Sequence, residues 1–363
     1  MKTLGGLLFC HRTAVTGLRP SARIARRRVR AHILWLLGFA CTVGLACTVA
    51  AGPATAAPNV GTAPAPASVT RVTTTIDTTC AGAPKQVPVT WYLPAGQPTG
   101  LVWLQHGFSR TAANLDVEAR NYAASGLLVA APTLDSVSVN GCGIAFNASD
   151  NTAFIRQMAL EFGHAVEPDS AVGRSFARAS AQAHRPDLTM PAQLVFSGHS
   201  AGGEFVLTAA NQLRTADPEA YRRLAGLVLF DPVNSFLGNN FYTSAKELGA
   251  AELPIRVIAS QPSVSNTGGL GVTWLSQTTR QDFLGVRLVT GVHIDVESDS
   301  TDLIGELSEL AVPRPRNGRV IRRLSAQWAD DLITGTRTPA YYPGGSYYQS
   351  LVASHTITTL PVG

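Results

Sequence analysis

One short stretch in the middle of the chain constrains the fold more than any other. An apolar run over residues 193–196 precedes Gly198-His199-Ser200-Ala201-Gly202, which fits G-x-S-x-G, and apolar residues at helical spacing follow directly. A strand, a sharp turn and a helix in this order hold a serine above a sheet edge with its Oγ exposed. Glycines two residues either side remove Cβ atoms that would collide across the turn. The stretch predicts a nucleophile at Ser200, with a fortuitous glycine-rich turn as the alternative.

Apolar runs and helical patterns alternate along the rest of the chain. Unbroken apolar runs of this kind are typical of strands covered on both faces, and they occupy 101–105, 126–131, 193–196, 227–230, 255–259 and 285–290. We therefore expect one α/β domain over 70–363, with a mostly parallel open sheet, helices on both faces, and functional side chains at the carboxyl ends of strands.

Smaller features complete this outline. Segments 70–76 and 87–93 alternate between polar and apolar residues and predict two opening antiparallel strands. A long helical pattern over 152–183 is expected to break near Pro168 and Gly173. The run at 285–290 is expected to be the last strand, and the aromatic tail 341–348 to pack on the surface.

The first 56 residues have the pattern of an export signal. A basic region at 26–30 precedes an apolar region at 33–51 and the small residues Ala54-Thr55-Ala56, which predict cleavage after Ala56. A Pro/Ala-rich tether over 57–69 follows. Two alternatives stay open: the apolar region is long enough to span a bilayer uncleaved, and Cys47 faintly resembles a lipid acylation site. After cleavage we expect no stable membrane insertion.

Charge and cysteine content fit an exported chain. The sequence holds 29 basic and 24 acidic residues, but residues 1–56 contain eight of the basic and none of the acidic ones. The remainder carries 21 basic and 24 acidic residues, so its composition does not favour nucleic-acid binding. Only Cys80 and Cys142 follow the predicted signal. An even number of cysteines in an oxidising compartment predicts one disulfide between them.

A serine hydroxyl needs a base to become nucleophilic, and the base needs an acid to orient it. His293 follows the strand at 285–290 and is favoured as the base, because it lies downstream of the serine in the chain order Ser…Asp…His; His355 is the alternative. Asp231 directly follows the strand at 227–230 and is favoured as the acid, with Asp282 and Asp295 as alternatives.

The remaining requirement is a pair of backbone N–H donors for the oxyanion. One should be the amide of Ala201, directly after the serine, and the other the amide of Phe108, in the loop His106-Gly107-Phe108 that follows the strand at 101–105. The ring of His199, inside the turn, is expected to point away from the nucleophile. Chemistry of this kind needs no metal and no organic cofactor.

Five segments together resemble a known superfamily. They are L-Q-H-G-F (104–108), G-L-L-V-A-A-P (126–132), G-H-S-A-G-G (198–203), L-V-L-F-D-P-V (227–233) and G-V-H-I-D (291–295). The chain resembles α/β-hydrolases over about 85–335, and among them the chlorophyllase and platelet-activating-factor acetylhydrolase-like esterases. Polyester hydrolases and cutinases share the first three segments but usually carry their acid one strand later. The resemblance implies carboxyl-ester hydrolysis through an acyl-enzyme.

The sequence thus predicts a secreted serine esterase acting on a small-molecule, lipid or polymer ester. Alternatives are a polyester hydrolase, an acyltransferase on the same triad, or an inactive secreted binding protein. Acyl length, the presence of a lid and the oligomeric state stay undetermined. The loops at 232–252 and 261–283 are expected to line the cleft, and their apolar residues could form either an acyl-binding wall or part of the core. These residues are Phe236, Phe241, Tyr242, Leu270, Val272, Trp274 and Leu275.

Overall fold

The computed structural model describes residues 68–363, except 148–149 and 236–237. The predicted signal (1–56) and most of the predicted tether lie outside the described residues. A nine-stranded sheet has the order β1-β2-β4-β3-β7-β8-β9-β10-β11. The strands are β1 (Thr70–Cys80), β2 (Ala83–Leu93), β3 (Leu101–Gln105), β4 (Leu128–Pro132), β7 (Leu194–His199), β8 (Leu224–Phe230), β9 (Ile255–Ala259), β10 (Gly285–Leu288) and β11 (Ile357–Thr359).

Neighbouring strands from β4 to β10 run parallel, whereas β1, β2 and β11 pair antiparallel with their neighbours. Strand β4 lies between β2 and β3, so the chain crosses from β3 back toward β2 and then continues on the other side of β3 with β7. This order and the antiparallel second strand define the α/β-hydrolase fold, and the predicted fold class is confirmed. A separate pair of short strands, β5 (Val137–Ser138) and β6 (Phe146–Asn147), lies in the segment after β4.

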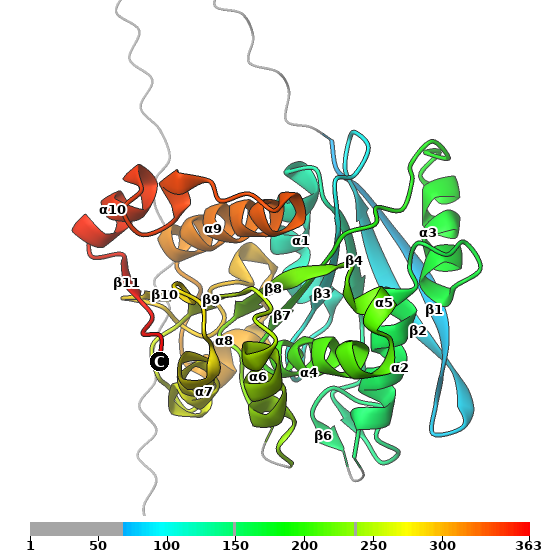
Figure 1. Cartoon of the computed structure of the whole chain (residues 1–363), viewed down its shortest axis with the longest axis horizontal. Coiled ribbons are helices and arrows are strands. Elements are labelled where there is room, and N and C mark those ends of the chain that lie inside the picture. The colour runs from blue at the N-terminus through cyan, green and yellow to red at the C-terminus, as the bar shows by residue number, and fades with distance from the viewer. Residues whose placement is uncertain (1–67, 148–149, 236–237) are drawn as a thin grey trace, which may run out of the picture. The chain divides into compact units, whose positions relative to one another are not determined.

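Helices cover both faces of the sheet (Figure 1). One face carries α1 (Asp116–Ala124), α9 (Pro315–Thr334) and α10 (Ser346–Ala353). The other carries α2 (Thr152–Gly163), α3 (Ala171–Gln182), α4 (Ala201–Ala216), α6 (Asn240–Ala250) and α7 (Leu270–Thr278). Shorter helices are α5 (Pro218–Tyr221), α8 (Leu303–Glu309) and the 3₁₀ turns η1 (Ala112–Leu115), η2 (Thr267–Gly269), η3 (Ser298–Ser300) and η4 (Pro339–Tyr341).

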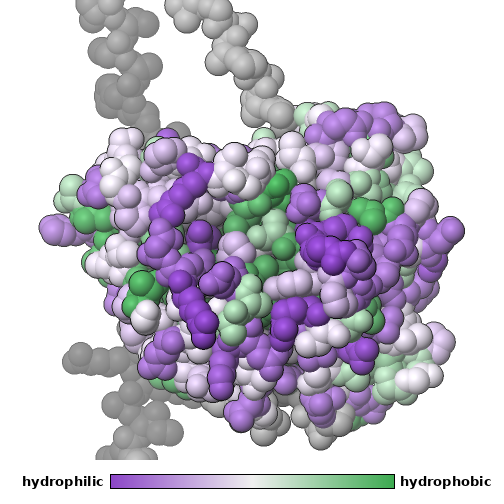
Figure 2. Space-filling model, in the orientation of Figure 1, coloured by the Kyte–Doolittle hydropathy of each residue, from purple (hydrophilic) through white to green (hydrophobic). Residues whose placement is uncertain are grey.

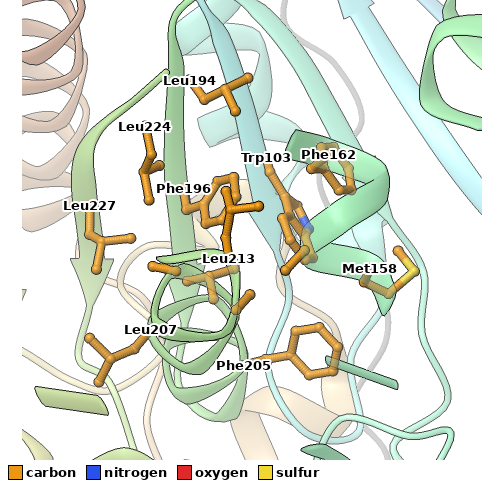
Figure 3. Close-up of a cluster of buried hydrophobic side chains, with 14 of the residues drawn as sticks. Trp103, Met158, Phe162, Leu194, Phe196, Phe205, Leu207, Leu213, Leu224 and Leu227 are labelled. Atoms are coloured by element: carbon orange, nitrogen blue, oxygen red, sulfur yellow. The ribbon is translucent and has the colours of Figure 1, made fainter. Parts of the chain in front are cut away.

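An aromatic cluster on β3 fixes the helices around the central strands (Figure 3). The indole of Trp103 stacks on Phe162 of α2 with ring centroids 4.1 Å apart. It meets Phe196 of β7 edge-on at 5.0 Å and Phe205 of α4 at 6.0 Å. Its buried N–H donates to Gln105 Oε1 (3.2 Å), so the ring leaves no donor unpaired. The cluster thereby clamps the strand before Ser200 and the helix after it onto β3.

On the face shown in Figure 2, apolar surface occurs only in limited patches between hydrophilic side chains. Within the described residues, none of the helices combines the length and the apolar content that a bilayer crossing requires.

The predicted break in the helical region 152–183 falls at 164–170, close to Pro168, and separates α2 from α3. Gly173 itself does not interrupt the helix, because it lies in the first turn of α3. Its N–H donates to the N-cap Ser170 Oγ (2.9 Å), and a Cβ there would lie 2.2 Å from the carbonyl oxygen of Glu167. Close approach of the backbone therefore explains this glycine.

Two expectations for the C-terminal part of the chain are wrong: that the aromatic tail 341–348 packs on the surface, and that the strand at 285–290 is the last one. Tyr342 and Tyr348 are almost fully buried, and their rings meet Phe283 edge-on at 5.6 and 5.9 Å. Strand β11 then pairs antiparallel with β10 and is the last strand of the sheet. A three-residue strand is too short to show an alternating pattern of polar and apolar residues. The aromatic residues of the tail have neither a helical nor a strand period, so the sequence does not indicate that they are buried.

The opening strands form a longer hairpin than predicted, with eleven residues each and a turn at Ala81-Gly82. At its tip Cys80 forms the predicted disulfide with Cys142, across 62 residues of sequence and a Cα–Cα distance of 5.9 Å. The bond ties the hairpin to the segment between β4 and α2.

We expect the double variant Cys80→Ser/Cys142→Ser to lose about 2–4 kcal/mol of unfolding free energy, because the crosslink restricts the unfolded chain. Urea denaturation measures this loss, and the native protein reduced with dithiothreitol serves as the matched comparison. Equal midpoints for oxidised and reduced native protein would contradict a stabilising crosslink.

Candidate active site

Ser200 lies in a strained turn between β7 and α4, with φ 57° and ψ −128°. The turn leaves no room for a Cβ atom at either flanking glycine. A Cβ on Gly198 would lie 2.4 Å from the carbonyl oxygen of Gly202, and a Cβ on Gly202 would lie 2.2 Å from that of His106. The elbow is therefore wedged against the end of β3. Its backbone is held further by the Ser200 N–H, which donates to the carbonyl of Phe230 at 3.1 Å.

The structure brings the three favoured residues together. His293 Nε2 lies 2.9 Å from Ser200 Oγ, and His293 Nδ1 lies 2.6 Å from Asp231 Oδ2. All three side chains are buried. Ser200 and Asp231 directly follow β7 and β8, and His293 lies in the segment after β10, so the cluster forms at the carboxyl edge of the parallel strands. These distances suit proton transfer from serine to imidazole, with a carboxylate orienting the ring.

The alternative residues are engaged elsewhere. The Asp282 carboxylate forms an ion pair with Arg337 at 2.9 Å. The Asp295 carboxylate accepts from the Val292 N–H (2.8 Å) and from Asn317 Nδ2 (2.7 Å), and so shapes the His293 loop. His355 lies beyond α10, on an exposed turn.

The Asp231 carboxylate is held by donors that sequence reasoning missed. Its Oδ1 accepts from the Ser260 N–H (3.0 Å), and its Oδ2 from the Ser260 hydroxyl and from Asn266 Nδ2 (3.0 Å). Burial alone would raise the pKa of Asp231, but the bond and charge of His293, with the Ser260 and Asn266 bonds, bring it below its ordinary value. Ser260 directly follows β9, the strand after the one that Asp231 follows. This position therefore holds a residue that donates to the Asp231 carboxylate, and not a second carboxylate.

The same pairing acts on the imidazole. Burial disfavours His293⁺, but the hydrogen bond and charge of Asp231 outweigh burial and raise the pKa of His293 above 6.5. The base must be neutral to accept the serine proton.

We therefore expect kcat/KM for a soluble p-nitrophenyl ester to fall as pH drops, with an acid-limb midpoint above 6.5. In Asp231→Asn the midpoint should move to lower pH, because the charge that favours imidazolium is gone. NMR titration of His293 in Ser200→Ala gives a direct check. A native midpoint at or below 6.5 would contradict the assigned pairing.

His106 orients the predicted oxyanion loop. Its Nδ1–H donates to the Gly107 carbonyl (2.8 Å), and its Nε2 accepts from the Leu134 N–H (3.0 Å). Burial lowers the pKa of His106 to about 4, so the ring is neutral. Because a trans peptide sets C=O and N–H in opposite directions, the Phe108 N–H points away from this ring. A Cβ on Gly107 would lie 2.9 Å from Ser200 Cβ, so the loop passes directly beside the serine.

The oxyanion roles of the Phe108 and Ala201 amides stay predictions. The Ala201 amide is the first of α4, where the helix dipole favours negative charge. Ala201 follows Ser200 directly in the chain, and Phe108 lines the same cavity as Ser200.

The expectation that His199 points away from the nucleophile is wrong. Its ring lines the cavity above Ser200, with its centroid 4.7 Å from that of His293, and its Nε2–H donates to the His293 carbonyl at 2.9 Å. Burial and the neighbouring His293 lower the pKa of His199 to about 3, so the ring is neutral. His199 is the last residue of β7, and the segment after β10 brings His293 beside its ring.

A buried ion pair adjoins this ring. Glu297 Oε1 lies 2.9 Å from Arg110 Nε and 3.9 Å from His199 Nδ1. The Arg110 guanidinium also pairs with Asp302 (2.9 Å). The pairs link the loop at 107–110 to the segment that follows His293, and no motif in the sequence pointed to them.

A cavity of about 350 Å³ opens above Ser200. The loop at 107–110 forms one wall, and Ile294, Ile304, Ser308 and Glu309 form another. Among the described residues of the loops expected to line the cleft, only Ser265 reaches the cavity. A larger groove of about 830 Å³ runs along α9 and contains none of the three clustered residues.

For the apolar residues of those loops, the structure favours the core over an acyl-binding wall. Phe241, Val272 and Leu275 are almost completely buried, whereas Tyr242 and Leu270 are partly exposed and do not line the cavity. Phe236 lies outside the described residues. These described side chains lie on α6, which packs beside α4, and on α7, which packs beside α6, on one face of the sheet.

Comparisons with known proteins find similarity only in structure. No family model matches the chain, and no curated protein matches its sequence. An esterase from Rhizomucor miehei is 14% identical with a TM-score of 0.46, over 74% of this chain and 85% of that one. The esterase domain of a Rhodothermus marinus protein is 15% identical with a TM-score of 0.40, over 70% and 98%. A hyperthermophilic esterase from the archaeon Pyrobaculum calidifontis is 15% identical with a TM-score of 0.46, over 73% and 83%. Similarity at this level identifies no substrate, so the chemistry is derived from the site itself.

Proposed function

We propose that the protein hydrolyses carboxylic esters through an acyl-enzyme on Ser200, with His293 as base and Asp231 as acid. The observation that carries this proposal is the continuous relay from Ser200 Oγ through His293 to Asp231, at 2.9 and 2.6 Å. It lies at a strained elbow beside a cavity. An inactive scaffold has no need of a buried relay of this kind, whose carboxylate accepts hydrogen bonds from four donor groups.

In the proposed mechanism, His293 Nε2 takes the Ser200 proton as Oγ attacks the ester carbonyl. The oxyanion accepts hydrogen bonds from the Phe108 and Ala201 amides. His293⁺ then gives its proton to the leaving alcohol, and the neutral ring activates water to release the acid. Asp231 stays ionised throughout and fixes Nδ1–H, so that Nε2 faces the serine.

Two finer proposals go with this function. The acid directly after β8, with Ser260 after β9, favours a member of the chlorophyllase and platelet-activating-factor acetylhydrolase-like esterases over a cutinase-like enzyme. We also propose that the protein is exported, and the disulfide between Cys80 and Cys142 supports an oxidising compartment. N-terminal sequencing of the protein recovered from culture medium tests export, with Ala57 expected as the first residue.

A fluorophosphonate probe tests the proposed function in one assay. Native protein should be labelled at Ser200 and lose its p-nitrophenyl esterase activity in parallel. Product analysis with and without an added acceptor alcohol separates hydrolysis from acyl transfer. An unlabelled, folded protein would contradict the proposal and would favour the inactive scaffold.

A further inference from the structure

The helix α8, ten residues beyond His293, exposes large apolar side chains. Five of the 14 exposed large apolar residues in the described part of the chain fall within 303–312. They form what we call the α8 face, with exposed fractions of 68% for Leu303, 62% for Ile304, 62% for Leu307, 89% for Leu310 and 60% for Val312. Single exposed apolar residues are ordinary, but clusters next to a cavity mark binding surfaces.

Attachment of α8 to the protein relies on polar contacts at its N-terminal end. The N-cap Asp302 accepts from the Gly305 N–H and pairs with Arg110, both at 2.9 Å, and receives a further bond from Asn114 (3.2 Å). Gly305 lies so close to the Arg110 guanidinium that a Cβ would come within 2.3 Å of Nη2. The exposed apolar side chains therefore do not serve to hold the helix in place.

The α8 face is continuous with the catalytic cavity. Ile304 belongs to both, and Ser308 and Glu309 of the same helix line the cavity above Ser200. Phe108, in the wall formed by the oxyanion loop, is 40% exposed. An apolar chain attached to an ester at Ser200 would therefore leave the cavity along α8.

The charges of α8 indicate which surface it fits. Its charged side chains are Glu306 and Glu309, and it contains no lysine or arginine. Apolar groups flanked by acidic ones suit an uncharged interface and are repelled by anionic lipid.

We propose that the α8 face adsorbs the enzyme to the surface of an uncharged, water-insoluble carboxylic ester, with its apolar chains fed along α8 toward Ser200. This inference rests on the proposed esterase function. Adsorption transfers the exposed leucine and valine side chains out of water, which is favourable in proportion to the apolar area removed.

The test uses the full chain with Leu303→Gln/Leu307→Gln/Leu310→Asn. Glutamine preserves helix propensity, and asparagine tolerates the left-handed backbone of Leu310 (φ 49°). Ile304 is left unchanged because it lines the cavity. Val352→Gln, at an exposed apolar position of α10, is the matched control.

Three readouts are compared: hydrolysis of dissolved p-nitrophenyl acetate, hydrolysis of emulsified tributyrin, and flotation with triolein droplets. We expect the triple variant to keep its activity on the dissolved ester within about twofold, and to lose at least about tenfold in tributyrin hydrolysis and droplet binding. The control should match the native protein in all three.

Several results would overturn the inference. These are native-like emulsion activity and flotation of the triple variant, absence of flotation by the native protein, or flotation only with phosphatidylglycerol vesicles. A native dimer that the triple variant converts to a monomer in size-exclusion chromatography would assign the face to a second copy of the chain. Activity on dissolved ester separates the two levels, because its absence in the native protein would count against the proposed function itself.

Discussion

Ser200→Ala should reduce kcat for p-nitrophenyl butyrate by about 10⁵–10⁶-fold, because no other group at the elbow can form the acyl-enzyme. The substitution removes one oxygen from a buried turn and creates no clash, so the free energy of unfolding should stay within about 1 kcal/mol of native. Stopped assays at high enzyme concentration and urea denaturation measure the two quantities.

Ser265→Ala is the matched control for this variant, since Ser265 lines the same cavity without lying at the elbow. Its activity should stay close to native. If purified Ser200→Ala retained native activity, or if Ser265→Ala lost as much as Ser200→Ala, the nucleophile would have to be reassigned.

Asp231→Asn should lower kcat by about 10⁴-fold, because an amide can present N–H to His293 and so stabilise the wrong tautomer. In the native protein, the Asp231 carboxylate also accepts hydrogen bonds from Ser260 and Asn266. The NH₂ group of the introduced asparagine cannot accept these bonds. Stability should fall too, since a buried pairing is broken. Steady-state kinetics and thermal denaturation, measured on the same preparation, separate the two effects.

Asp282→Asn is the control here, because its carboxylate is exposed and its ion pair with Arg337 lies on the surface. We expect native kinetics. A large loss in Asp282→Asn together with a small one in Asp231→Asn would transfer the role of the acid.

Much of the fold was predictable because it depends on local patterns. Unbroken apolar runs mark parallel strands buried on both faces, and the regular alternation of strands and helices leaves few topologies. The favoured residues were recognisable for a related reason. Each of Ser200 and Asp231 directly follows a buried strand, and His293 comes shortly after one, so parallel order alone sends all three to one edge of the sheet.

Contacts between distant segments were not predictable in this way. Ser260 and Asn266 are ordinary polar residues in sequence, and only the packing of β8 beside β9 turns them toward Asp231. The same holds for the approach of His199 to the His293 carbonyl, because the two residues belong to segments 94 positions apart in the sequence. In the tail, Tyr342 and Tyr348 are buried because they pack against Phe283, which lies more than 50 residues earlier in the sequence.

The sequence by itself therefore determined the α/β architecture and the candidate nucleophile, base and acid, because hydrophobic periodicity and turn chemistry act over a few neighbouring residues. Only the tertiary structure decided which groups support the acid, where the cavity opens, and that α8 exposes its apolar side chains at the cavity's edge. Those outcomes depend on which surfaces remain uncovered after the whole chain has packed, and no local pattern contains that information.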